Sequence, residues 1–289
     1  MTGTSTKNAK IRVDLDQNEL VKRDQLLTLM LLSTKRGGVP IRSSFVQRSE
    51  DMKRPDGSRG ASLSKLVTDE RALDGFLLIH ALASSSDPYD VRAPAATWAQ
   101  MVGLLETNEL LSGQQRWSRV VAKLKSLQLI TTKPDGRGTR YTLLDESGDG
   151  SPYVRPQDIQ THGGWVSLPH IYWLEGYDRR LRMPGKIMLL IALDQRNKFT
   201  LPADRVPKWY GVSRSTAQRG FTELENEGIL TSTSSTIFDR SAPNHYRTEK
   251  IYEAQGLWTK AERRRAMTRV RGAAKSASTG SQPPQGAAP

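Results

Sequence analysis

The stretch GVSRSTAQRGFTELENEGIL, residues 211–230, has the pattern of a tight turn, a short helix and the start of a strand. Gly211 permits a backbone turn that residues with a Cβ resist, and Ser213 is a favourable N-cap for the helix that follows. Gly228 stops the helix, and Ile229 begins a β-like run. The stretch therefore predicts a helix that begins at Ser213 and ends before Gly228.

This helix, residues 213–227, has an apolar face and a polar N-terminal end. Its apolar positions recur at i, i+4 and i+7, which places them on one side, and they are Ala217, Phe221 and Leu224. The residues off this face near the N-terminal end are Arg214, Ser215, Gln218 and Arg219. A helix with a packed rear and a basic, hydroxyl- and amide-rich front suits the major groove of DNA.

The same pattern recurs, displaced by 100 positions, in QQRWSRVVAKLKSLQLI at residues 114–130. The corresponding pairs are Arg119 with Arg219, Val121 with Phe221, and Leu124 with Leu224. The polar front of this earlier helix consists of Gln114, Gln115, Arg116, Ser118 and Arg119. An insertion, LLETNELLSG, lies after Gly103, where the later copy has only GVS. A lengthened turn tilts or buries the first helix, so the second copy is the better candidate for base readout.

The sequences on either side of the two helices also correspond. Buried helices are expected at residues 73–83 and 184–195, each followed by a short extended piece and a tryptophan-bearing helix. Two strands follow each polar helix, joined by a Pro-Asp-Gly turn in the first copy and by a longer connection in the second. Helix, short strand, helix, turn, helix and hairpin is the order of the winged helix-turn-helix fold. The sequence predicts two such domains in tandem, in a mainly α protein with small β-hairpin wings (α+β).

Composition divides the chain into five expected segments. They are an N-terminal helix and basic loop extension (1–60), a first winged-helix domain (61–146), a linker (147–163), a second winged-helix domain (164–258) and a basic, largely disordered tail (259–289). Residues 18–32 predict a helix that packs on the core or, alternatively, forms a homodimer. Residues 33–60 predict a basic hairpin or a solvated loop. Residues 165–181 are rich in aromatic side chains, which we expect to cover the second core rather than to stack on single-stranded nucleic acid.

The charge of the chain favours a polyanionic partner. The formal net charge of the 289 residues is +13, and residues 260–289 alone carry seven Lys or Arg against Glu262. No apolar run approaches the length of a membrane span, and the N-terminus lacks a secretory pattern. The absence of cysteine excludes disulfides and thiolate chemistry. We expect a cytoplasmic protein associated with the nucleoid or a plasmid.

The stretch 211–230 resembles the recognition segment of GntR-type winged-helix regulators. The matching positions are Gly211, Val212, Ser213, Arg214 and Thr216, the apolar residues at 217, 221 and 224, and then Glu225, Glu227 and Gly228. The resemblance implies operator contacts by Arg214, Ser215, Thr216, Gln218 and Arg219. It covers about 20 residues, and it departs from that family because the match is C-terminal and follows a second, similar unit. Two winged helices in tandem are similar instead to a class of plasmid replication initiators.

No pattern of catalytic residues emerges from the sequence, and we expect neither an enzyme nor a bound cofactor. There is no phosphate-binding loop of the Walker type. Asp14 and Asp16 form only an isolated acidic pair, and the four histidines show no metal-ligand spacing. These histidines are His80, His162, His170 and His245, of which His80 is expected to pack in an apolar helix and His245 to lie on the second wing.

The sequence therefore predicts a double-stranded DNA-binding protein, and a transcriptional regulator is the first choice of role. A plasmid-type replication initiator is the alternative, and a protein-interaction module is a third possibility. Beyond the two polar helices, the residues expected to contact the DNA backbone are Arg137 and Arg140 on the first wing, Arg240 and Arg247 on the second, and Arg263, Arg264 and Arg265 in the tail.

Overall fold

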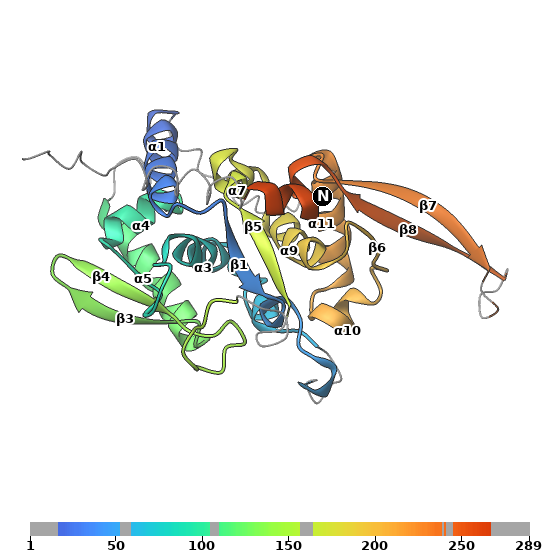
Figure 1. Ribbon diagram of the computed structural model, residues 1–289, viewed down its shortest axis with the longest axis horizontal. Helices are drawn as coiled ribbons and strands as arrows, with labels where there is room; N and C mark the ends of the chain where they lie inside the picture. The colour runs from blue at the N-terminus through green and yellow to red at the C-terminus, as the bar shows by residue number, and fades with distance from the viewer. Residues whose placement is uncertain are drawn as a thin grey trace, which may run out of the picture.

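The computed structural model describes residues 17–52, 59–104, 110–156, 164–238, 240 and 245–266. Within these ranges the protein is a mixed α+β structure with small sheets, one of two strands and two of three strands. Figure 1 shows the three-stranded sheets on opposite sides of the two-stranded one. The acidic pair of Asp14 and Asp16 and the histidine His162 lie outside the described residues.

The first three-stranded sheet and its helices form what we call the first unit. Its elements are α3 (Glu70–Leu82), β2 (Asp90–Ala93), α4 (Ala95–Met101), α5 (Leu110–Ser126), β3 (Ile130–Asp135) and β4 (Gly138–Leu143). The strands are antiparallel in the order β2-β4-β3. Asp69 accepts a hydrogen bond from Ala72 N at 3.0 Å and caps α3, whose residues are almost all buried, as a helix apolar on every side requires.

The second unit repeats this order of elements. It consists of α9 (Met183–Asp194), β6 (Lys198–Thr200), α10 (Val206–Tyr210), α11 (Arg214–Asn226), β7 (Leu230–Phe238) and β8 (Tyr246–Ala254). Its strands are antiparallel in the order β6-β8-β7, which matches the first sheet strand for strand. Tyr141 of β4 and Tyr252 of β8 occupy equivalent positions, each two residues before the C-terminal end of its strand. The two segments therefore share one topology.

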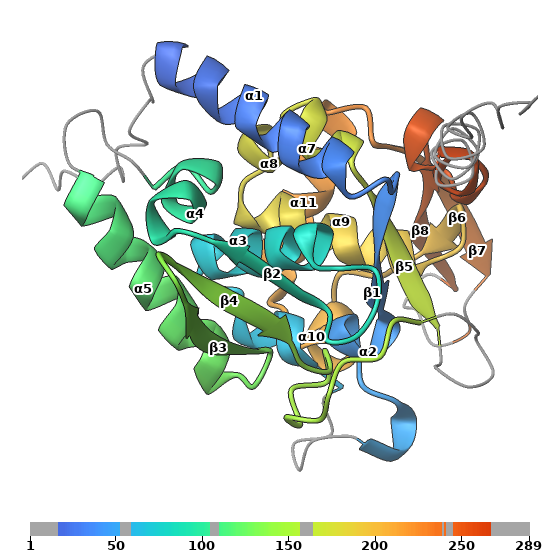
Figure 2. The same ribbon diagram turned by 60° about the vertical axis from the view of Figure 1, so that its left-hand side comes forward.

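A pair of strands joins the two units, and each strand of the pair precedes one unit in the sequence. β1 (Gly38–Arg42) pairs antiparallel with β5 (Trp165–Pro169), and Figure 2 shows this pair running between the units. All five residues of β1 are buried. The expectation of a basic hairpin or solvated loop at residues 33–60 is therefore wrong for this part of the segment, because β1 is an interior strand.

Other helical segments in the described ranges are one long helix and several short ones. These are α1 (Gln17–Ser33), α2 (Ser43–Val46), η1 (Glu50–Met52), η2 (Ser62–Lys65), α7 (Ile171–Leu174), α8 (Tyr177–Arg180) and η3 (Gly256–Trp258). The helix expected at residues 18–32 is α1, which packs on α4 and α7 through the buried Leu27 and Leu31. Tyr172 and Trp173 of α7 are buried as well, so they cover the core as expected.

Two buried ionic clusters also link the units. Lys186 of α9 is 1% exposed, and its Nζ lies 2.7 Å and 2.8 Å from the carboxylate oxygens of Asp74 in α3 and 2.8 Å from Oε1 of Glu70. Arg23 of α1 donates to Met101 O at 2.9 Å in the first unit and pairs with Asp178 ahead of the second. The first cluster ties α9 to α3, and the second ties α1 to α4 and to α8.

The segments expected as a linker and a disordered tail are partly folded. Glu146 is fully buried next to Arg42, and Leu144 forms a bridge with Pro152, so residues up to 156 lie against the first unit. A helical turn at 260–266 follows η3 and packs on the second unit. Long-range contacts therefore order residues 147–156 and 260–266, whose local composition is typical of loops, whereas residues 157–163 and 267–289 lie outside the described residues.

Candidate nucleic-acid interface

The turn between α10 and α11 has the geometry that its sequence predicts. Gly211 has a left-handed backbone with φ of 66°, and Val212 is buried below the turn. Ser213 Oγ accepts a hydrogen bond from Thr216 N at 3.1 Å and caps α11, which ends before Gly228, also at φ of 66°. The predicted start and end of this helix are therefore confirmed.

The rear of α11 packs closely on α9. Ala217, Phe221 and Leu224 are buried, as predicted, and Gly220 lies between them. A Cβ at Gly220 would lie 2.4 Å from both Pro184 O and Met188 Cγ, so the two helices touch at their backbones. This contact fixes the direction in which the opposite face of α11 points.

The front of α11 carries four of the five predicted contact residues. Arg214, Ser215, Gln218 and Arg219 are all exposed. Thr216 is not, because it is buried and its hydroxyl lies 2.8 Å from Ser213 Oγ. Thr216 therefore serves the helix cap and is removed from the set of DNA-contacting candidates.

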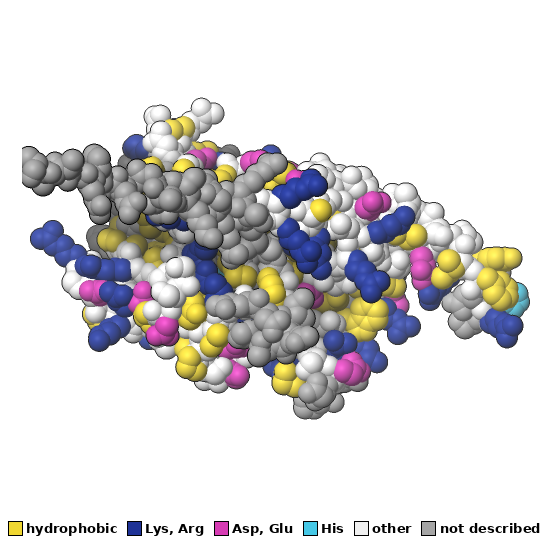
Figure 3. Space-filling model, viewed as in Figure 1, with side chains coloured by type: hydrophobic (Ala, Val, Ile, Leu, Met, Phe, Trp, Pro, Cys, Tyr) yellow, Lys and Arg dark blue, Asp and Glu magenta, His cyan; other side chains and the backbone are white. Residues whose placement is uncertain are grey.

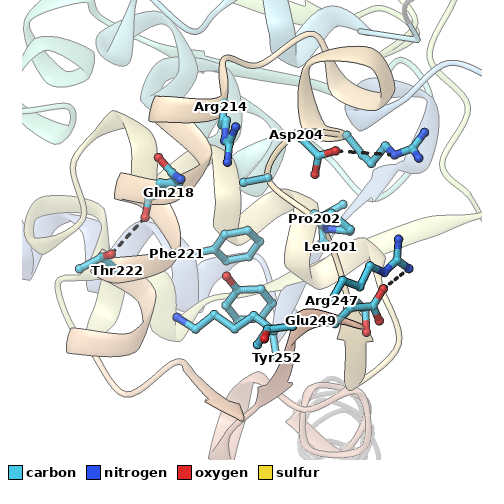
Figure 4. A pocket seen from close by; sticks show the side chains of 15 residues that line it. Leu201, Pro202, Asp204, Arg214, Gln218, Phe221, Thr222, Arg247, Glu249 and Tyr252 are labelled. Atoms are coloured by element: carbon cyan, nitrogen blue, oxygen red, sulfur yellow. Dashed lines mark hydrogen bonds and ion pairs between the residues drawn. The ribbon is translucent and has the colours of Figure 1, made fainter. Parts of the chain in front are cut away.

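A groove of about 570 Å³ continues from the front of α11 to the hairpin β7–β8. Figure 4 shows Arg214 and Gln218 on one side of it and Arg247 and Glu249 on the other. Phe221 and Tyr252 form its floor, with their rings stacked at a centroid distance of 3.9 Å. Burial, followed by the charge of Glu225, raises the pKa of Tyr252 to about 12.

The cations that line this groove differ in their partners. Three are paired with carboxylates, namely Arg205 with Asp204, Arg247 with Glu249, and Lys250 with Glu225. Burial acts to raise the pKa of Glu225, but hydrogen bonds from Lys250 and Ser232 outweigh it and lower the pKa. Among the lining residues in the described part of the chain, Arg214 is the cation that no carboxylate neutralises. Arg214 is therefore the best-placed cation for an external anion.

The equivalent helix of the first unit, α5, has a similar polar face, but its buried face packs differently. Gln115 and Arg119 are exposed on α5, whereas Gln114 and Arg116 are half-buried. Trp117 replaces Ala217 at the equivalent buried position, stacks on Trp98 at 5.1 Å and donates to Tyr141 Oη at 2.8 Å. Relative to α11, α5 begins one turn earlier, so part of the predicted insertion is helix rather than turn. Residues 105–109 of this insertion lie outside the described residues.

The predicted arginines of the first wing have different surroundings. Arg137 is exposed at the turn between β3 and β4. Arg140 lies 2.8 Å from Asp90 and 2.5 Å from Asp135, and its hydrogen bond lowers the pKa of Asp135 below the usual value. Arg140 thus braces the sheet, which weighs against a primary role in DNA binding.

The predicted arginines of the hairpin β7–β8 and of the C-terminal segment differ in how exposed their side chains are. Arg240 and Arg247 are exposed, although Arg247 is paired with Glu249. Arg264 and Arg265 are also exposed. Arg263 is instead buried and donates to Trp258 O, Ser167 O and Leu193 O. The prediction that it contacts phosphate is therefore wrong, and its role is structural. Burial, followed by the neighbouring Arg264 charge, lowers the pKa of Arg263 to about 10.

Two of the described histidines are buried, and the third lies on the hairpin β7–β8. His80 is buried 3.3 Å from Glu146, as its position in an apolar helix predicts. His170 is buried, and desolvation together with Arg36 lowers its pKa to about 4. His245 is exposed beside Phe238 at the end of the hairpin. No group of three metal-ligating side chains occurs within the described residues.

Sequence reasoning missed two exposed aromatic residues on the hairpin β7–β8. Phe238 and Tyr246 form the last pair of the hairpin, with 62% and 59% of their surfaces exposed. The signal was available in the alternation of the two strands, which places both on one face. Figure 3 also shows Lys and Arg side chains over both units on the face turned to the viewer.

In the described ranges, no helix is both long and apolar enough to cross a membrane. The chain matches no protein-family model and no curated protein sequence.

Proposed function

We propose that each unit is a winged helix-turn-helix domain and that the chain is a sequence-specific double-stranded DNA-binding protein without enzymatic activity. Both sheets have the strand order that this fold requires, with the third helix leading into a two-stranded wing. α11 enters the major groove, and the hairpin β7–β8 lies along the flanking backbone. A transcriptional regulator, located in the cytoplasm on the nucleoid or a plasmid, is the first choice of role.

The observation that carries this proposal is the front of α11. Arg214, Gln218 and Arg219 are exposed on a helix whose rear is locked to α9, and Arg214 has no carboxylate partner among the described residues. A guanidinium held in this way offers donors to the O6 and N7 atoms of guanine or to phosphate. The same groove continues onto the wing, so base and backbone contacts share one surface.

A replication initiator that binds repeated origin sites is the second candidate. The antiparallel β1–β5 pair and the buried cluster around Lys186 support it, because they hold two reading helices at a fixed separation within one chain. Selected sites that are palindromic and lie at promoters favour the regulator. Direct repeats at an origin favour the initiator.

The decisive experiment is selection of bound fragments from a random duplex library at about 0.15 M salt with competitor DNA. We expect an enriched motif. Arg214→Ala should then lower affinity for that motif by about 1–3 kcal/mol and relax specificity at one position, and Arg219→Ala should do the same. Lys22→Ala is the matched control, since it removes one exposed positive charge on α1, far from α11 in the chain.

Three results would contradict parts of the proposal. Full affinity in both arginine variants would show that α11 is oriented differently. Binding without any enriched motif, which weakens steeply with salt, would mean that the basic surface is generic. Little affinity for duplex at this salt would favour the protein-interaction module.

A further inference from the structure

The hairpin of the second unit is longer than that of the first. β7 and β8 form nine residue pairs, whereas β3 and β4 form six. The additional pairs extend the hairpin by about 10 Å, at roughly 3.4 Å per residue. Figure 1 shows this hairpin projecting well away from the body of the protein.

The end of this long hairpin is aromatic and exposed. Phe238 and Tyr246 lie opposite each other with an edge-to-face centroid distance of 5.7 Å, and Phe238 also stacks on His245 at 6.2 Å. Both large rings are more than half exposed. A pair of rings at the last paired position of a projecting hairpin contributes nothing to the core.

Strand alternation places these rings on the α11 side of the hairpin. Tyr252 stacks on Phe221 of α11, and side chains two residues apart share a face, so Lys250, Thr248 and Tyr246 lie on the face of Tyr252. Phe238 lies on it too, because it is paired with Tyr246. The aromatic pair therefore lies further along the face whose Thr248, Lys250 and Tyr252 line the groove in front of α11, although the pair itself does not line that groove.

The strand residues of this face carry no carboxylate of their own. They are Ser232, Ser234, Thr236 and Phe238 on β7 and Tyr246, Thr248, Lys250 and Tyr252 on β8. Near α11 the face is bordered by Glu225, which accepts from Ser232 and Lys250, and by Glu249, which is paired with Arg247. Between there and the aromatic pair, the hydroxyl groups of Ser234, Thr236 and Thr248 can donate hydrogen bonds to phosphates.

The distance along the hairpin corresponds to the spacing between DNA grooves. Tyr246 precedes Tyr252 by six residues and lies about 20 Å from it along the strand, toward the distal end of the hairpin. Half of a helical turn of DNA is about 17 Å, so a duplex with α11 in its major groove presents the adjacent minor groove near the tip. In the first unit, the last pair of the hairpin toward its turn includes Gly138, three residues before Tyr141 and about 10 Å from it along the strand. This hairpin is too short to reach a neighbouring DNA groove.

We propose, on the basis of the function proposed above, that Phe238 and Tyr246 form an apolar wedge that enters the minor groove beside α11 and bends the bound DNA. Apolar side chains inserted at a base step partly unstack it and kink the duplex by about 20–90°. The bend brings more backbone toward the wing, and flexible pyrimidine–purine steps beneath the tip are favoured. The second unit thereby reads deformability at positions where α11 makes no base contact.

The test uses the full chain and a duplex carrying the selected motif. The bend is measured by circular permutation of the site, and unstacking by 2-aminopurine fluorescence at each step flanking the motif. We expect a bend of about 20° or more and one bright step about half a turn from the α11 contacts. In the double variant Phe238→Ser/Tyr246→Ser, both signals should disappear, and affinity should fall on the order of tenfold, as loss of a base–aromatic contact would cause. Both rings are exposed, so this change leaves the fold intact.

The matched control is Ile237→Ser, which alters the opposite face of the same hairpin. It should retain the bend and the bright step. A wild-type complex that binds its motif with straight, fully stacked DNA overturns the wedge and leaves the proposed function standing. So does a double variant that bends DNA as the wild type does, or one that loses only single-strand binding or only self-association. Failure to select any duplex overturns both proposals.

Discussion

Replacement of Lys186 by methionine should destabilise the protein in a manner that depends on pH. Lys186 lies almost fully buried between two carboxylates of α3, and Asp74 is itself only 8% exposed. Methionine fills a similar volume but leaves Asp74 as a buried charge without its main partner. Breaking a buried ion pair from one side costs about 3–5 kcal/mol. We expect about 3 kcal/mol, the lower end of that range, because Arg71 remains 3.7 Å from Asp74 and half exposed.

The pH dependence follows from the pKa of Asp74. Burial already raises this pKa above 3.8 in the wild type, although Lys186 and Arg71 oppose the shift. Without Lys186 the pKa rises further. A carboxyl whose pKa is higher in the folded than in the unfolded state binds more protons when folded, so stability falls as pH increases through the interval between the two values. The deficit of the variant relative to the wild type should therefore be largest near neutral pH and shrink toward pH 4.

The assay is urea denaturation followed by tryptophan fluorescence, at several pH values, for the wild type, Lys186→Met and Asp74→Asn/Lys186→Met. The double variant removes the buried charge, so it should recover most of the lost stability and show no pH-dependent deficit. A single-variant cost below about 1 kcal/mol would refute the assigned role of the cluster, since exposed pairs contribute that little. A deficit that grows as pH falls would refute the sign of the argument.

Three further predictions concern packing, the C-terminal segment and acid stability. Gly220→Ala places a Cβ 2.4 Å from Pro184 O and should cost about 3 kcal/mol of stability by overpacking. Gly228→Ala has open space around it, so it should cost only roughly 1 kcal/mol, because its backbone is left-handed. Equal costs of the two variants in urea denaturation would contradict the close contact between α11 and α9. Arg263→Ala should lower the melting temperature yet leave the salt dependence of DNA affinity unchanged, and a slope reduced by about 1 would show instead that this guanidinium binds phosphate. Desolvation lowers the pKa of His170 to about 4 in the folded protein, below the unfolded value of 6.5. Stability should therefore be lost as the pH falls from 6.5 to 4, because the unfolded state takes up the proton. A His170→Gln variant whose stability depends on pH as that of the wild type does would exclude this histidine as the cause.

The elements that sequence analysis predicted well are those specified by neighbouring residues. α11 has the expected cap at Ser213, the expected left-handed glycines at both ends and the expected buried stripe. The displacement of 100 residues between α5 and α11 also has an observed counterpart, since the order of elements and strands is the same in both units. Periodicity, capping and turn residues act over a few positions, and a single sequence displays them directly.

The features that sequence analysis missed depend on partners far along the chain. β1 is a five-residue strand containing glycine and proline, and its partner β5 lies more than 120 residues away. Arg263 is buried because three carbonyl groups from separate segments converge on it, although its neighbours in the sequence are basic and exposed. Thr216 has the polarity of a DNA contact, but helix rotation turns it inward. The basic character of residues 33–60 and the polarity of Arg263 and Thr216 instead predict surface positions for all three.

The β1–β5 pair also determines where the chain can be divided. Each unit is preceded by a strand whose hydrogen-bonding partner precedes the other unit, so neither half contains every backbone partner that it needs. A fragment starting at residue 164 would retain β5 with its paired edge open, together with the apolar side of α9. Open strand edges pair with other chains, and the strand of matching length and sequence is β5 of another copy. Separate expression of the halves should therefore turn this internal seam into a strand-to-strand contact between copies.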